Sequence, residues 1–240
     1  GFNCFNGAGK AVEVEKTNRY YVSDIYFNSP TSKDPAKGEA IMSNKSGYGI
    51  IERCYLYDSR RGIDFTNSWN CIVNDSMCMN ARFTTHGLLS KFITFNNCYV
   101  YGEDDSVTAF HGFTFGNESY LYDEEITVNN CYIYGGFNGL LALTKCKNVR
   151  VINSKFYNNR MGIVLSDVNG FEVRGCSFKN CENTMSLTNV SNGLISSMVV
   201  DEPRSDRAQG SFRVDGISSD ILFSDIKVNI NRANIFDITT

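Results

Sequence analysis

The chain has 240 residues, of which 42% are hydrophobic, so it is long enough to bury a substantial core. Its net charge is −3 and its pI is about 5.5, which disfavours nucleic acid and anionic membrane surfaces as partners. No apolar run reaches the length of a membrane-spanning helix, and the first residues do not resemble a signal peptide. We therefore expect no membrane insertion and a fragment of a longer chain.

A short pattern recurs along the chain: an apolar residue, two polar residues, a small residue, any residue and an apolar residue. Its clearest copies are ITFNNCYVY at 93–101 and ITVNNCYIY at 126–134. In chain order, the small residues are Asp24, Cys54, Ser76, Cys98, Cys131, Ser154, Cys176, Ser197 and Asp225. Most intervals between them are 21 to 23 residues, which indicates a solenoid with a period of about 22 residues and a few loop insertions.

A second apolar run begins eight residues after the small residue in four copies. These runs are GIDF from Gly62, GLLAL from Gly139, GIVL from Gly162 and TMSL from Thr184. Alternation with period two places Ile63 and Phe65 inside and Asp64 outside. We predict an all-β fold, a right-handed single-stranded parallel β-helix that forms one domain over 1–240. The rival fold, an antiparallel sandwich, gives no reason for one column to repeat every 22 residues.

Turns such as VRVINSKFYNNRMGIVL and FEVRGCSFKNCENTMSL resemble the pectin-lyase-like parallel β-helix proteins. That family includes pectate lyases, polygalacturonases, alginate and chondroitin lyases and phage tailspike depolymerases, and the resemblance covers essentially the whole chain. It implies a polysaccharide substrate and either a glycoside hydrolase or a polysaccharide lyase. The resemblance favours the body of a phage tailspike or a related depolymerase that acts on bacterial surface glycans. It also implies a homotrimer in a virion tail or outside the cell.

The longest interval, from Cys98 to Cys131, is the first place to look for function because solenoids add specificity through loops. It contains seven carboxylates, and no Lys or Arg occurs from Phe92 to Thr144. Three interpretations stay open: a solvated loop, a pair of carboxylates for general acid and base catalysis, or a calcium site. The catalytic candidates here are Glu103, Asp104, Asp105 and His111, and the calcium candidates are Asp123, Glu124 and Glu125.

The run GEDDSVTAFHG resembles the polygalacturonase run in which an Asp pair is followed by Gly-His, although Phe110 stands where that family has Gly. The resemblance puts Asp104 and Asp105 in the acidic role and His111 in the histidine role. Adding 22 residues to Asp64 leads to His86, so we expect these two side chains near one stretch of surface.

Two chemistries are compatible with these candidates. A hydrolase would use Asp64 and the acidic run 103–105, whereas a lyase would use His86 or His111 as base and Arg61, Arg82 or Ca²⁺ to neutralise a sugar carboxylate. Arg60, Arg61 and Arg82 suit an anionic sugar. The alternative is a purely structural role, in which His86 caps a turn and His111 lies in a loop.

Tyrosines occupy the outward positions one and three residues after several small residues. We expect Tyr99, Tyr101, Tyr132 and Tyr134 to bind substrate by stacking on sugar rings, or to form a contact between protein chains. Four of the nine cysteines, Cys54, Cys98, Cys131 and Cys176, occupy the interior column. We interpret the cysteines as reduced thiols, which agrees with folding in a reducing cytoplasm. We expect no other cofactor. The alternative function is a non-catalytic glycan-binding adhesin or a structural spike segment.

Overall fold

The computed structural model describes residues 10–28, 39–59, 61–85, 89–102, 111–116, 123–142, 145–201, 211–229 and 235–239, together with the backbone of 3–5. The described residues form strands and no helix, so none of them forms a helix that could cross a membrane. The strands lie in two sheets.

The ten-stranded sheet contains one strand from each turn of the chain. Its strands are β2 (Val12–Glu15), β5 (Glu39–Asn44), β8 (Arg61–Thr66), β11 (Phe83–Thr85), β14 (His111–Phe115), β17 (Asn138–Ala142), β20 (Met161–Ser166), β23 (Asn183–Thr188), β25 (Phe212–Asp215) and β27 (Phe236–Thr239). The four runs predicted from Gly62, Gly139, Gly162 and Thr184 all lie in this sheet, as β8, β17, β20 and β23.

The seventeen-stranded sheet takes two strands from most turns, one of six residues and one of three. The longer strands are β3 (Asn18–Ser23), β6 (Gly47–Glu52), β9 (Trp69–Asn74), β12 (Lys91–Asn96), β15 (Glu124–Asn129), β18 (Lys147–Ile152) and β21 (Asn169–Arg174). The short strands are β1 (Asn3–Phe5), β4 (Tyr26–Asn28), β7 (Tyr55–Tyr57), β10 (Met77–Met79), β13 (Tyr99–Tyr101), β16 (Tyr132–Tyr134), β19 (Lys155–Tyr157) and β22 (Ser177–Lys179). In the last turns, β24 (Ser191–Asp201) and β26 (Ser219–Asn229) replace the two separate strands.

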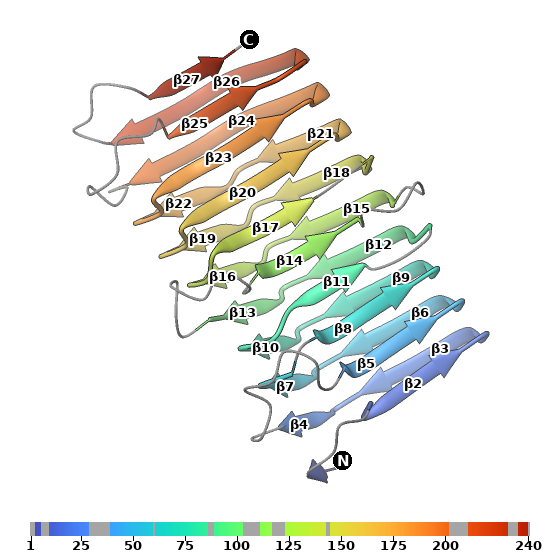
Figure 1. Cartoon of the computed structure of the whole chain (residues 1–240). Helices are drawn as coiled ribbons and strands as arrows, with labels where there is room; N and C mark the ends of the chain where they lie inside the picture. The colour runs from blue at the N-terminus through green and yellow to red at the C-terminus, as the bar shows by residue number, and fades with distance from the viewer. Residues whose placement is uncertain are drawn as a thin grey trace.

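Each strand pairs in parallel with its counterparts in the turns before and after it, as β12 does with β9 and β15. Figure 1 shows the resulting coil, with the N-terminal turns at the bottom, the C-terminal turns at the top and the ten-stranded sheet toward the viewer. The predicted all-β fold with stacked parallel turns is confirmed.

The bends of the coil are made by single residues with left-handed backbone conformation, many of them Asn or Asp. Asn97 and Asn130, at one such bend, have φ of 53° and 51°. Their side chains also connect the turns, because Asn130 Nδ2 donates to Asn97 Oδ1 at 2.7 Å and Asn97 Nδ2 donates to Asp75 Oδ1 at 3.0 Å. The Asn-rich pattern in the sequence therefore marks both the bend and the contact between turns.

The interior is a column of stacked apolar side chains. Phe83, Phe95 and Phe113 are fully buried, with ring centroids 5.2 to 5.5 Å apart. The eight cysteines whose side chains the structure describes are buried free thiols, as predicted. Burial raises the pKa of Cys98 well above its usual value, so this thiol stays protonated.

The predicted column of small residues is wrong by one position in three turns. Asp24, Ser197 and Asp225 have φ of 57°, 52° and 49°, so they are the bend residues. The interior position is the next residue in each turn: Ile25, Met198 and Ile226. The pattern failed there because the interior residue is large and a small polar residue stands just before it.

Candidate functional site

Asp64 lies on β8 between the core residues Ile63 and Phe65, and its side chain has no exposed surface. Oδ2 accepts a hydrogen bond from Nη1 of Arg61 at 2.7 Å, and Oδ1 accepts one from Oγ1 of Thr84 at 2.7 Å. The same Arg61 nitrogen donates to Oε1 of Glu39 at 2.8 Å. Both oxygens of Asp64 are therefore occupied by side chains of this chain.

The count of 22 residues from Asp64 does not give the register of this turn. The residue beside Asp64 in the next turn is Thr84, twenty positions later, because this turn is shorter than the average period. His86 itself lies outside the described residues, as do Arg60, Glu103, Asp104 and Asp105. Their predicted roles stay predictions.

His111 begins β14, two strands from Asp64 in the same sheet. Its side chain is half-buried, and burial together with the positive charge of Arg82 lowers the pKa of the imidazole to about 4. His111 is therefore neutral at pH 7. Its Nδ1 is buried and has no hydrogen-bond partner among the described residues. A neutral imidazole with a free ring nitrogen can act as an acceptor or a base.

Two further polar atoms on this part of the sheet are also buried without a hydrogen-bond partner among the described residues. Asn138 lies beside His111 in register on β17, is 5% exposed, and its Oδ1 has no partner within the described part of the chain. Oγ1 of Thr114 on β14 is likewise buried and unpartnered there. Buried polar groups in folded proteins are nearly always hydrogen-bonded, so such a cluster indicates a place where a polar ligand binds. Neither Asn138 nor Thr114 was predicted as a site residue from the sequence.

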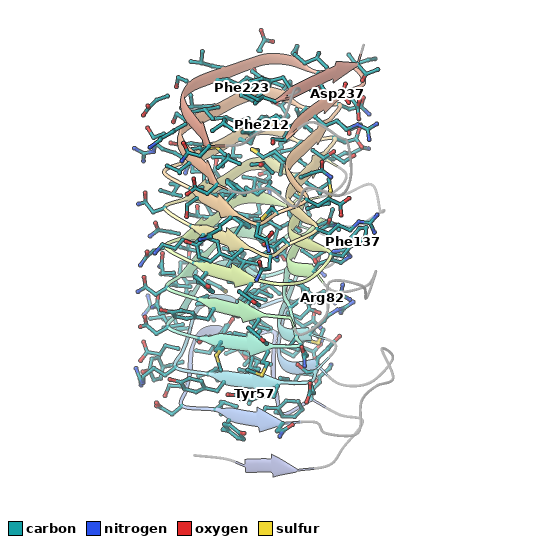
Figure 2. All side chains as sticks on the ribbon, turned by 90° about the vertical axis from the view of Figure 1, so that its left-hand side faces the viewer. Tyr57, Arg82, Phe137, Phe212, Phe223 and Asp237 are labelled. Atoms are coloured by element: carbon teal, nitrogen blue, oxygen red, sulfur yellow. The ribbon has the colours of Figure 1, made fainter. Side chains whose placement is uncertain are left out.

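Arg82 joins this cluster through its effect on His111. It is half-buried, immediately before β11, and its positive charge disfavours protonation of the imidazole. Figure 2 shows Arg82 and Phe137 at the right-hand edge, on the side of the ten-stranded sheet. The structure thus brings together two predicted residues, His111 and Arg82, while it holds Arg61 in the separate network with Asp64.

The predicted calcium residues are engaged elsewhere. Asp123 is 1% exposed and accepts hydrogen bonds from Thr85 Oγ1 at 2.6 Å and from the amides of Ser90 and Gly116 at 2.9 and 2.8 Å. Burial raises its pKa, and these three hydrogen bonds oppose that rise. Asp123 is a buried structural residue, and its hydrogen bonds hold the chain in place just before β15.

The two neighbouring glutamates form ion pairs at the surface. Glu124 lies 2.8 Å from Lys91 and 3.8 Å from Lys147, and Glu125 lies 3.4 Å from Arg150. The acidic insertion thus recruits cations from adjacent turns. The described residues contain no group of three or more His, Cys, Asp or Glu side chains that could hold a metal. The calcium site predicted at 123–125 is therefore not supported.

The four predicted tyrosines lie on β13 and β16, in the seventeen-stranded sheet. Tyr101 and Tyr134 stack with centroids 5.1 Å apart, and Tyr99 and Tyr132 are 6.1 Å apart. Tyr99 remains 53% exposed. The His111 cluster lies on β14 and β17 of the ten-stranded sheet. The tyrosines and the His111 cluster are therefore separate surfaces.

Residues 94–236 match a family model described as a right-handed β-helix region. No curated protein is similar to the chain in sequence. Among solved structures, the family 28 exopolygalacturonase of Yersinia enterocolitica is similar with a TM-score of 0.56 and 12% identity, over 92% of this chain and 46% of that one. The hyperthermoactive exopolygalacturonase of Thermotoga maritima has a TM-score of 0.53 and 10% identity, over 78% of this chain and 55% of that one. This chain spans about half the length of these two structures.

Proposed function

Because this chain belongs to the family of right-handed β-helix proteins, we propose that it degrades a polysaccharide at the outer face of the ten-stranded sheet, around His111 and Arg82. The observation that carries the proposal is the neutral His111 imidazole, whose buried Nδ1 has no partner among the described residues and which lies in the field of Arg82. A base beside a cation is the pair that proton abstraction next to a sugar carboxylate requires.

The geometry supports β-elimination on an acidic polysaccharide over hydrolysis. In this reaction the neutral imidazole of His111 takes the proton from the carbon that bears the sugar carboxylate, and Arg82 neutralises that carboxylate. The electron pair of the broken C–H bond forms the C=C bond, and the glycosidic oxygen leaves with a proton from water. Hydrolysis would need two available carboxyl groups. Among the described candidates, Asp64 has both oxygens occupied and Asp123 is buried in hydrogen bonds.

The test is incubation of the intact protein with acidic and neutral bacterial polysaccharides, following reducing ends and the absorbance of unsaturated uronates. We expect the unsaturated chromophore with acidic substrates and its loss in His111→Ala. Ser186→Ala, in a half-buried outward position three strands further along the same sheet, is the matched control. Reducing ends without the chromophore would instead indicate hydrolysis and overturn the role of His111.

The stacked tyrosines of β13 and β16, called here the tyrosine ladder, are Tyr99, Tyr101, Tyr132 and Tyr134. They favour a second candidate function, a glycan-binding adhesin or spike segment without catalysis. Stacked, partly exposed aromatic rings suit either sugar rings or another protein chain. Binding of a glycan without any product would support this function. More specifically, we propose that the chain is the body of a phage tailspike that trimerises through this ladder. The eight buried free thiols agree with folding in a reducing cytoplasm.

A further inference from the structure

A fixed turn presents Phe137 beside the His111 cluster. Gly135 and Gly136 have φ of 72° and 94°, a conformation that favours glycine, and a Cβ on Gly135 would lie 2.2 Å from the carbonyl oxygen of Gly102. Nδ2 of the fully buried Asn159 donates to the Gly135 carbonyl at 2.5 Å. The turn between β16 and β17 is therefore set by its glycines and by a buried side chain of the next turn.

Phe137 in turn positions a cation. The guanidinium carbon of Arg160 lies 4.7 Å from the centroid of the Phe137 ring, and Nε of Arg160 lies 3.4 Å from Oε2 of Glu182. The Arg160 amide also donates to the Gly136 carbonyl at 3.1 Å, which keeps the two segments adjacent. The Arg160 side chain is 36% exposed, so a held guanidinium still reaches the surface.

Phe137 connects this cation to the cluster around His111, because its ring contacts Arg160 on one side and lies near the His111 ring. The ring of His111 lies 6.3 Å from the ring of Phe137, and Asn138 directly follows Phe137 in the chain. A surface ion pair between Arg160 and Glu182 alone would not explain why Oδ1 of Asn138 is buried without a partner in the described residues. A ligand with both a hydroxyl and a carboxylate would satisfy Asn138 and Arg160 together.

We propose that Arg160 and Asn138 form a subsite for a uronic acid residue, adjacent to the sugar held at His111. Arg160 binds the sugar carboxylate, Oδ1 of Asn138 accepts a sugar hydroxyl, and Phe137 is a positioning residue for Arg160. The inference rests on the proposed function, since it assigns the neighbouring unit of the same acidic polysaccharide. Strands in a sheet lie about 4.8 Å apart, so a glycan along the coil meets β14, β17 and β20 in succession.

The test is calorimetric titration of the full chain with hexamers of galacturonate and of mannuronate, each compared with its carboxyl-reduced neutral form. We expect Arg160→Gln to weaken binding of the acidic hexamer at least about tenfold, the loss of one charge-assisted hydrogen bond, and to leave binding of the neutral form unchanged. Arg174→Gln is the matched control, because Arg174 forms a similar exposed pair with Glu172 at 3.0 Å on β21 of the other sheet. It should change neither affinity.

Affinity within twofold of the native protein in Arg160→Gln would overturn the subsite, as would failure of the native protein to bind either acidic hexamer. Phe137→Leu tests the positioning role separately and should weaken only the acidic hexamer. The proposed reaction is judged on its own product. Charge-selective binding that depends on Arg160, with no unsaturated product from any substrate, would keep the subsite and reject the lyase. Unsaturated product that forms equally well in Arg160→Gln would keep the lyase and reject the subsite.

Discussion

Nη1 of Arg61 lies 2.7 Å from Oδ2 of Asp64, inside a network in which Asp64 has no exposed surface and Arg61 is 8% exposed. Arg61 also donates to Glu39, and Asp64 also accepts from Thr84, so Arg61 keeps a carboxylate partner when Asp64 is removed. The network therefore ties β8 to β11 through Thr84 and to β5 through Glu39.

We expect Asp64→Ala to lower the free energy of unfolding by about 1 to 3 kcal/mol, because buried donors of Arg61 and Thr84 lose their acceptor. Glu172→Ala removes an exposed partner of Arg174 and should cost less than about 1 kcal/mol. Urea unfolding of both variants measures the difference. Equal, small losses in the two variants would show that Asp64 is not needed to stabilise this turn.

His111 makes stability depend on pH. Its pKa is about 4 in the folded protein, below the value of about 6.5 for an unfolded histidine. Between these values the unfolded chain binds the extra proton, so stability should fall as the pH is lowered from about 6.5 to about 4. His111→Asn should remove this part of the pH dependence. Urea unfolding at pH 7 and pH 4.5 tests it, and identical pH dependence in both proteins would contradict the lowered pKa.

Much of the fold could be predicted from the sequence because each turn repeats the same physical requirement. An inward residue such as Val128 must be apolar, and a bend residue such as Asn130 must tolerate left-handed backbone, so both recur as columns. The exceptions occur where the bend residue is also small and polar. Asp24 and Ser197 satisfied the pattern for the interior position although they occupy the bend.

The site was less predictable because it depends on which turns are shorter or longer than 22 residues. His86 looked equivalent to Asp64 by counting, yet the turn between β8 and β11 places Thr84 there. Arg160 and Phe137 lie 23 residues apart in neighbouring turns, and they meet beside the bend at Gly135 and Gly136. The Gly-Gly-Phe run was the available signal, because two glycines before an aromatic residue mark an unusual turn.

Substitution of Asp123 tests whether this residue has a structural role or binds calcium. In Asp123→Asn, one carboxylate oxygen becomes an amide donor that faces either the Ser90 amide or the Thr85 and Gly116 donors. We expect a loss of about 1 to 3 kcal/mol, the cost of unsatisfied buried polar groups. Thermal unfolding of the native protein should be the same in EDTA and in excess Ca²⁺. A rise in Tm with Ca²⁺ that Asp123→Asn abolishes would restore the calcium hypothesis.

The buried thiols should resist modification in the folded protein. The eight cysteines whose side chains the structure describes are buried, and burial raises the pKa of Cys176 and Cys181 to about 12, so little thiolate is present at pH 8. We expect none of these eight to react rapidly with Ellman's reagent in the native protein, and all nine to react in guanidinium chloride. Rapid reaction of two or more thiols under native conditions would contradict this burial.

Six turns have either cysteine or serine at the interior column, which predicts that the two are interchangeable there. At Ser76 the hydroxyl donates to the Asn74 carbonyl at 2.9 Å and accepts from the Cys54 amide at 3.1 Å. At Cys98 the thiol donates to the equivalent Asn96 carbonyl at 3.3 Å. Because a serine at position 98 would find the same acceptor, we expect Cys98→Ser to change the free energy of unfolding by less than about 1 kcal/mol.

Cys78 provides the contrast in the same coil. Its thiol is fully buried beside Gly62, since a Cβ on that glycine would lie 2.3 Å from the sulfur, and no hydrogen bond of the thiol is seen among the described residues. A hydroxyl there would be buried without a partner, so Cys78→Ser should cost about 1 to 3 kcal/mol. Urea unfolding of the two serine variants side by side measures the difference. Equal losses would mean that the presence of a carbonyl acceptor does not decide whether serine can replace cysteine.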